Sequence, residues 1–372
     1  MIVAVNTIPV GKNTPITLNN YIYEAFTRIA QQHPGNTFLF ILDRPYPEIT
    51  FAGNIIPVVM RPAGPPSWWW KLWYNFKLPF LVKKYNADVL VTGEVSSSLL
   101  KIPQCLVIER PVFSHDHTFV KRNNLRFHRR NTRHFLQKVT KIIATSQACK
   151  TKILNHFEMG NNKIELIRSG IDPIFRQEAI AERENVKQQY TGGNEFFLIT
   201  IGEDNRPDLL QLLKAFSIFK KRLKSNMQLL IIDTDKQQVD TFAKSLRLYK
   251  FGDAVQHIHS LSKTETANIT AAAYAMIHTA QYDYSGYPVL QGLKSGVPVI
   301  TDNSGALPEI VGDAALFIES TDPASLAEKM MLLYKDERLR NELVIKGIEK
   351  AKNYNWEETA RLLWEVVVKI RI

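Results

Sequence analysis

The sequence predicts an α/β protein made of two doubly wound, Rossmann-like domains. At 372 residues the chain is longer than a single hydrophobic core usually supports, so two domains are expected. Short apolar runs typical of buried parallel strands alternate with longer amphipathic stretches typical of helices. Apolar residues make up 45% and charged residues 22% of the chain, which is ordinary for a packed globular protein.

The first half contains seven predicted strands with four predicted helices among them. Runs such as Thr37-Phe-Leu-Phe-Ile-Leu42 are rich in the residues that favour buried strands. The strands are expected at residues 3–8, 37–42, 56–59, 88–92, 105–109, 141–145 and 164–167. The helices are expected at residues 17–32, 72–85, 123–137 and 147–156.

The second half repeats the same alternation and then ends in three helices. Its strands are expected at residues 196–201, 228–233, 255–258, 276–278, 297–301 and 314–317. Its earlier helices are expected at residues 207–223, 237–248, 263–272 and 288–295. We therefore expect an N-terminal domain at 1–172, a second domain at 173–354, and a C-terminal helix at 355–372 that is a candidate to cross back to the first domain.

The sequence also indicates where the protein works. The chain opens directly on an apolar strand, without the basic segment and small-residue cleavage site of a signal peptide. No stretch approaches the roughly 20 apolar residues of a membrane-spanning helix. Cys105 and Cys149 fit no metal-binding spacing. We expect a cytoplasmic protein, with peripheral contact to the inner face of the membrane as an open alternative.

Positive charge is concentrated in the first half of the chain. Residues 1–172 carry 22 Lys and Arg against 10 Asp and Glu, whereas residues 173–372 carry 25 against 26. No acid occurs between Asp116 and Glu158, and a tryptophan cluster surrounds Trp69. We expect an acceptor or membrane patch at Trp69, Arg126, Arg129, Arg130 and Arg133. Such a field attracts an anionic acceptor or membrane surface, although a solvated helix face has the same pattern. Nucleic acid is not expected, because stacking aromatics are sparse there.

The segment from Asp283 to Ile300 carries the most specific pattern. Gly286 precedes a helix that Pro288 opens, Gly296 ends that helix, and a buried strand follows. A loop that enters a helix through glycine leaves backbone N–H groups at the positive end of the helix dipole. Phosphates bind at such places.

This segment resembles the acidic-x7-acidic motif of the retaining nucleotide-sugar glycosyltransferases of family four, usually written E-x-F-G-L-P-x-x-E-A-x-x-x-G-x-P-V. Asp283 stands at the first acidic position and Gln291 at the second. Other pieces follow the family's order. Ile142-Ile-Ala-Thr-Ser146 resembles its last N-domain strand, Lys163-Ile-Glu-Leu-Ile-Arg-Ser-Gly-Ile-Asp172 resembles its domain boundary, and Asn355-Trp-Glu357 is similar to its closing helix.

The resemblance implies the GT-B fold, in which two Rossmann-like domains face a cleft. It also implies a hexosyltransferase that moves a sugar, with retention, from a nucleoside diphosphate sugar to a glycan or lipid-linked acceptor in surface polysaccharide synthesis. The donor would bind the second domain and the acceptor the first. No metal and no other cofactor is implied.

The family's site residues carry over to matching positions. Asp283 takes the catalytic position, and the donor and nucleotide site comprises Gly202, Arg206, Leu261, Gly286, Tyr287, Pro288, Val289 and Gln291. Pro288 contributes no N–H, so the amides near its neighbours would stabilise the charge that grows on the β-phosphate. Gly11 and Lys12 are candidates for a phosphate contact from the N-domain.

Two departures from the family pattern keep a second function open. Glu203 stands where the family has an arginine, and Gln291 replaces a carboxylate that grips the ribose. Asp283 and Gln291 also flank a helix start, where an acid or an amide can simply cap backbone N–H groups. The alternative is a non-catalytic glycosyltransferase-like protein that serves as a binding or scaffold partner.

Overall fold

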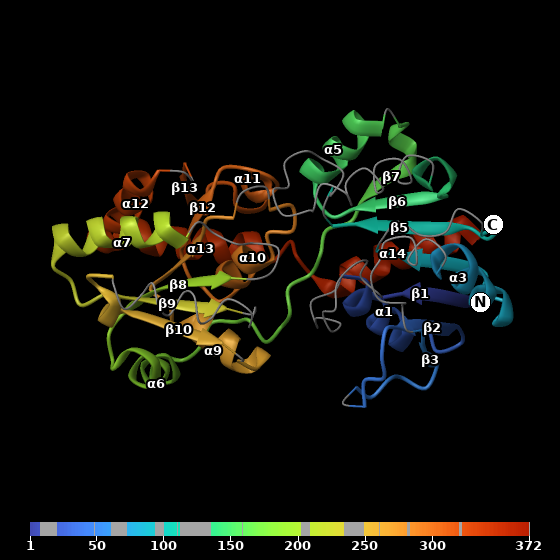
Figure 1. The fold of residues 1–372 in the computed structure, drawn as a ribbon, viewed down its shortest axis with the longest axis horizontal. Helices are drawn as coiled ribbons and strands as arrows, with labels where there is room; N and C mark the ends of the chain where they lie inside the picture. The colour runs from blue at the N-terminus through green and yellow to red at the C-terminus, as the bar shows by residue number, and fades with distance from the viewer. Residues whose placement is uncertain are drawn as a thin grey trace. The chain divides into compact units, whose positions relative to one another are not determined.

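The computed structural model (Figure 1) describes residues 1–7, 21–47, 49–60, 73–93, 100–109, 111, 135–157, 159–201, 209–233, 249–259, 261–280, 283–319 and 322–371. The chain divides into two compact units. Unit 1 comprises Met1–Gly170 with Asn355–Ile372, and unit 2 comprises Ile171–Tyr354. None of the helices in the described part of the chain is long and apolar enough to cross a membrane.

Unit 1 is built on a seven-stranded parallel sheet of order β3-β2-β1-β4-β5-β6-β7. The strands are β1 Ile2–Asn6, β2 Thr37–Leu42, β3 Ile55–Val59, β4 Val89–Thr92, β5 Gln104–Ile108, β6 Lys141–Ala144 and β7 Ile164–Leu166. The order reverses between β1 and β4. In open parallel sheets such a reversal creates a crevice at the carboxyl ends of the strands.

The helices of unit 1 pack apolar faces against this sheet and against one another. They are α1 Tyr21–Gln32, a π-helical turn η1 Trp73–Lys77 that continues into α3 Leu78–Lys84, α5 Gln147–Phe157 and α14 Trp356–Arg371. On α3, Leu78, Leu81 and Val82 join a core with residues of β1, β2 and β4. The C-terminal α14 packs on α1, where the rings of Trp356 and Tyr21 meet edge to face at 5.7 Å.

Unit 2 contains a six-stranded parallel sheet of order β10-β9-β8-β11-β12-β13. Its strands are β8 Phe196–Ile201, β9 Gln228–Asp233, β10 Val255–His259, β11 Ala275–His278, β12 Val299–Asp302 and β13 Ala315–Ile318. Here the order reverses between β8 and β11. The carboxyl end of β11 therefore lies at the switch point of this sheet.

Helices cover the unit 2 sheet, with α7 beside α12 and α6 beside α9 (Figure 1). They are α6 Ile180–Thr191, α7 Leu209–Leu223, α9 Lys263–Ala272, α10 Tyr287–Lys294, α11 Leu307–Val311, α12 Pro323–Lys335 and α13 Glu337–Ala351. The α7 side of the core joins Phe216 and Phe219 to Phe197 and Ile277 of the sheet.

The predicted fold class, two Rossmann-like domains of α/β type, is confirmed. Three predicted strands, 37–42, 196–201 and 228–233, coincide with β2, β8 and β9. The strand predicted at 297–301 begins two residues later, at Val299. The helix predicted at 72–85 is a π-helical turn followed by an α-helix. The helix predicted at 237–248 lies outside the described residues.

Sequence reasoning missed α6 entirely. This helix is polar on nearly every side, and only Lys187 and Thr191 are buried in it. Without an apolar stripe, periodicity gives no helical signal. The one available signal was the Gly192 that ends it, which has a left-handed φ of 59°.

Gly170 is the last residue of the N-terminal segment of unit 1, and it contacts the start of α14. A Cβ added there would lie 2.3 Å from the backbone N of Trp356 and 2.6 Å from its Cα. The Thr359 hydroxyl also donates to the Arg168 carbonyl at 2.8 Å. The close approach of two backbones therefore requires glycine at position 170.

We expect Gly170→Ala to destabilise unit 1 by about 1–3 kcal/mol, because backbone atoms of α14 must move to admit the methyl group. Gly35→Ala is the matched control, since a Cβ at Gly35 meets no atom within 4 Å. Thermal unfolding of both variants measures the difference. Equal melting temperatures for the two variants would contradict this account of the α14 contact.

Candidate functional site

The loop between β11 and α10 contains the pattern that the sequence singled out. Gly286, the residue before α10, has a left-handed φ of 56°, and a Cβ there would lie 2.3 Å from Cδ1 of Ile310. Both facts require glycine, because side chains are strained at this φ and the space is already filled. The chain can therefore turn tightly into the helix only with this residue.

Asp283 holds this loop in place through its carboxylate and its carbonyl. Its Oδ1 accepts hydrogen bonds from the Ser285 N–H at 2.7 Å, the Ser285 hydroxyl at 2.9 Å and the Gly286 N–H at 2.9 Å. Its carbonyl oxygen accepts from the Ala306 N–H at 2.8 Å. Asp283 thus joins its own loop to the turn that follows β12.

The other carboxylate oxygen of Asp283 pairs with a histidine. Nε2 of His278 lies 3.0 Å from Oδ2 of Asp283, and the two side chains are only 2% and 8% exposed. Burial alone raises the pKa of Asp283. The hydrogen bond and electrostatic attraction of His278, with the Gly286 and Ser285 amides, outweigh burial and hold this pKa well below its ordinary value. Asp283 is therefore a fixed carboxylate at neutral pH.

His278 and its neighbours lie on the sheet face that α10 covers. A Cβ on Gly292 of α10 would lie 3.0 Å from Sδ of Met276 and 3.4 Å from Val299. Because side chains alternate along a strand, His278 shares the face of Met276. The register pairs His278 with Thr301 of β12. The Thr301 hydroxyl is buried and makes no hydrogen bond within the described part of the chain.

The first turn of α10 supplies backbone donors next to Asp283. Leu290 donates its N–H to the Gly286 carbonyl, which closes the first intrahelical bond. The earlier amides of a helix have no intrahelical acceptor, and Pro288 has no N–H. The N–H groups of Tyr287 and Val289 are therefore the donors of this first turn that have no acceptor within the helix. Gln291, one turn on, is a buried residue with 7% of its surface exposed.

The segment between β10 and α9 holds the remaining described candidate, Leu261, which is half-buried. Ser262 caps α9, accepting from the Glu265 N–H at 3.2 Å while Glu265 accepts from the Ser262 N–H at 2.8 Å. Nearby, Nε2 of His257 lies 3.4 Å from Oδ2 of Asp233, and His259 is exposed at the end of β10. Helix α9 in turn contacts α10.

The structure does not test the other predicted site residues. Gly11, Lys12, Trp69, Arg126, Arg129, Arg130, Arg133, Gly202, Glu203 and Arg206 lie outside the described residues. What the structure adds is His278, which the sequence analysis did not include in the site. A histidine at the end of a strand, five residues before an acid, was the available signal.

Two family descriptions match successive parts of the chain. Residues 20–175 match the family described as "Glycosyltransferase Family 4", and residues 182–350 match "Glycosyl transferases group 1". The chain belongs to the family-four glycosyltransferases. This confirms the resemblance inferred from the acidic-x7-acidic segment and the predicted GT-B fold.

Curated relatives of this glycosyltransferase are distant. It is 20% identical over 237 residues to the O-antigen chain mannosyltransferase B of Escherichia coli, covering 63% of this chain and 62% of that protein. It is 20% identical over 260 residues to the O-antigen chain mannosyltransferase RfbU of Salmonella typhimurium, covering 70% and 69%. The first match therefore spans less than two thirds of that relative's length.

Solved structures share the fold over nearly the whole chain. The crystal structure of WaaG, a glycosyltransferase involved in lipopolysaccharide biosynthesis, superposes with a TM-score of 0.76 at 14% identity and covers 99% of both chains. The Anabaena HepE structure in complex with UDP-glucose gives a TM-score of 0.75 at 14% identity, covering 99% of this chain and 100% of that one. At this identity the likeness concerns the fold alone.

We expect Asp283→Asn to destabilise unit 2 by about 1–3 kcal/mol at pH 7, because the hydrogen bonds to a charged acceptor are weakened. Free aspartate titrates near pH 3.9, and the folded-state pKa is lower. The contribution of ionised Asp283 is therefore complete above about pH 4 and is lost as the pH falls through the folded pKa.

Melting temperatures of wild type and Asp283→Asn, measured from pH 7 to pH 3, check this. The gap between them should narrow below about pH 4. Asp253→Asn, at an exposed position of the same unit, is the control for loss of one negative charge. A gap that stays constant with pH would mean that the charge of Asp283 does not stabilise the fold.

Proposed function

We propose that this chain is a retaining hexosyltransferase that moves a sugar from a nucleoside diphosphate sugar to a glycan or lipid-linked acceptor in surface polysaccharide synthesis. The observation that carries the proposal is the Asp283 loop at the start of α10. It combines a fixed carboxylate with the first-turn backbone donors of a helix at the switch point of the unit 2 sheet.

The proposed donor fits the polarity of this loop. Departure of the nucleoside diphosphate leaves negative charge on the β-phosphate, which preorganised amides and the helix dipole stabilise. The Tyr287 and Val289 N–H groups of α10 are in the position to do so, and Gly286 lets the backbone approach closely. Arg206, which follows β8 in the sequence, is the proposed cation on the diphosphate.

The Asp283 carboxylate retains one hydrogen-bond acceptor position for a substrate hydroxyl. An ionised carboxylate offers about four acceptor positions. Each oxygen has about two of these positions, so the three protein donors share those of Oδ1, and His278 takes one of the two at Oδ2. The remaining acceptor position of Oδ2 is where a hydroxyl of the donor sugar would bind. The proposed role of Asp283 is to orient the sugar during transfer.

The relatives support this donor and acceptor chemistry. The matched proteins are named O-antigen chain mannosyltransferases and a lipopolysaccharide glucosyltransferase. Solved GT-B neighbours include HepE in complex with UDP and with UDP-glucose. We therefore propose a nucleotide sugar as donor and a surface glycan or its lipid-linked precursor as acceptor. The expectation of a reaction without metal or cofactor remains part of the proposal.

A non-catalytic role is the competing function, and one structural observation favours it. Most acceptor positions of Asp283 are already occupied by its own loop and by His278. Glu203 and Gln291 are further departures from the family pattern. A binding or scaffold protein would retain nucleotide binding without turnover, or lose both.

The donor proposal predicts binding of a nucleoside diphosphate sugar at millimolar concentration or below. Calorimetric titration with UDP-, GDP-, ADP- and TDP-sugars measures it. If Gln291 contacts the ribose, Gln291→Glu should tighten binding about five- to tenfold, because a charged acceptor makes stronger hydrogen bonds than a neutral one.

Gln189→Glu, at an exposed position of α6, is the control for the added charge. Absence of binding by every nucleotide sugar would overturn the enzyme proposal. Binding without transfer to any glycan or lipid-linked acceptor would favour the non-catalytic role. Unchanged affinity in Gln291→Glu would mean that the ribose binds elsewhere.

The proposal also includes peripheral contact with an anionic membrane. The contact would be made by the basic segment, the acid-free residues 117–157. Each basic group near an anionic leaflet contributes about 1 kcal/mol. Co-sedimentation with vesicles should therefore rise with anionic lipid content and fall at high salt. Changing Arg126, Arg129, Arg130 and Arg133 to glutamine should weaken it.

The control changes four basic residues of unit 2, Lys214, Lys221, Arg222 and Lys335, to glutamine. These residues are exposed, so the same charge is lost from the other half of the chain. If both quadruple variants bind vesicles equally well, the basic segment is a solvated surface and not a membrane contact.

A further inference from the structure

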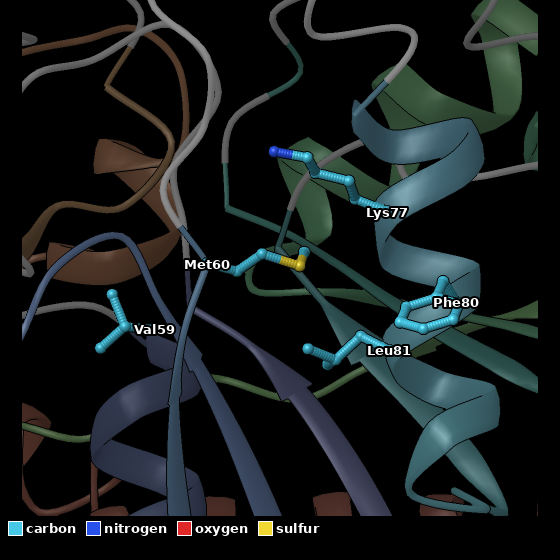
Figure 2. Close-up of a pocket in the computed structure, with 5 residues that line it drawn as sticks. All are labelled: Val59, Met60, Lys77, Phe80 and Leu81. Atoms are coloured by element: carbon cyan, nitrogen blue, oxygen red, sulfur yellow. The ribbon is translucent and has the colours of Figure 1, made fainter.

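Unit 1 contains an apolar cavity between the carboxyl end of β3 and the helix α3. It has a volume of about 500 Å³ and is lined by Val59, Met60, Lys77, Phe80 and Leu81. Figure 2 shows Met60 reaching from the strand side toward α3, which carries Phe80 and Leu81, with Lys77 just before them. The volume lies within the range of small-ligand sites. Four apolar residues and one ammonium group thus line an open, ligand-sized depression.

The surface around this cavity is unusually apolar for an exposed helix. Phe76 is 63% exposed and Phe80 is 72% exposed, and their i, i+4 spacing places them on one side of the helical segment. On the edge strand β3, Ile56 and Val59 are 40% and 42% exposed. Large exposed apolar side chains on these two elements indicate a contact site.

The charge around the cavity selects the partner. Lys77, Lys83 and Lys84 are exposed on the same helical segment. Lys77 makes no ion pair with any residue that the structure describes. No Asp or Glu occurs in the sequence between Glu48 and Asp88. The complementary ligand is therefore anionic as well as apolar.

From these observations we infer that the cavity binds the hydrocarbon chain of a lipid monophosphate, with the Lys77 ammonium group on the phosphate. The chain lies against Met60, Phe80 and Leu81. Exposed phenylalanines with flanking lysines are the side chains that suit a boundary between hydrocarbon and phosphate headgroups. If the proposed function holds, on which this last step rests, the lipid is the carrier of the acceptor.

The test uses dodecyl phosphate, below its micellar concentration, titrated calorimetrically into the full chain without nucleotide. Wild type should bind it, and dodecanol and inorganic phosphate should each bind at least tenfold more weakly. Phe80→Ser should weaken dodecyl phosphate binding tenfold or more. Lys77→Gln should also weaken dodecyl phosphate binding tenfold or more. It should abolish the preference for dodecyl phosphate over dodecanol.

The matched controls are Ile345→Ser and Lys335→Gln, which remove an exposed apolar side chain and an exposed ammonium group from unit 2, away from the cavity. Their affinities should remain within twofold of wild type. Phe80 is largely exposed, so Phe80→Ser should also keep the wild-type melting temperature. This shows that any lost binding is not lost folding.

Several outcomes would overturn the inference. Inorganic phosphate binding as tightly as dodecyl phosphate would leave only an anion site. Equal losses in Ile345→Ser and Phe80→Ser would mean general surface adhesion in place of binding at the cavity. Because no nucleotide is present, a failure here is separate from a failure of the donor titration.

Discussion

The hydrogen bonds that converge on Asp283 are the constraint on which the candidate site of unit 2 depends. This one residue joins the end of β11 through His278, its own loop through Ser285 and Gly286, and the turn after β12 through Ala306. Because the loop is anchored at three places, the backbone donors in the first turn of α10 are held in place. Fixed donors stabilise developing charge without reorganisation, which is what transfer from a diphosphate requires.

Side-chain length at this position matters as much as charge. The family motif has glutamate where this chain has Asp283, and aspartate is one methylene shorter. A longer side chain would extend its carboxylate beyond the loop, whereas Asp283 keeps both oxygens within reach of Ser285, Gly286 and His278. The aspartate at this position therefore holds the loop. A single acceptor position on Oδ2 is what remains for a ligand.

Apolar periodicity was enough to predict most of both sheets, because buried parallel strands are nearly continuous apolar runs. The strand 196–201 needed no tertiary information, since every residue of β8 except Thr200 is buried. Helix α6 was missed for the opposite reason, because its polar surface carries no period. Local sequence therefore predicted elements that bury a regular apolar face, such as β8. It did not predict α6, which buries no such face.

The candidate site was predicted only in part. Gly286 was recognisable because the turn into α10 needs a left-handed φ, which glycine adopts readily. Pro288 was recognisable because the first turn of a helix tolerates proline. Both signals are local in the sequence. The pairing of His278 with Asp283 depends on how a strand end and a loop fold back on each other. No periodicity describes that path, so the sequence showed both residues without showing that they touch.

The two halves of the chain attract anions by different physical means. Residues 173–372 have nearly balanced charge, so attraction at the α10 start must come from oriented amides that act over a few ångströms. Residues 1–172 carry more than twice as many basic as acidic groups, and that excess acts over the Debye length of about 8 Å at physiological salt. A fixed dipole selects the geometry of a single phosphate, whereas a broad positive field selects an extended anionic surface or a charged amphiphile. This contrast agrees with the proposed polar donor on unit 2 and the proposed anionic acceptor on unit 1.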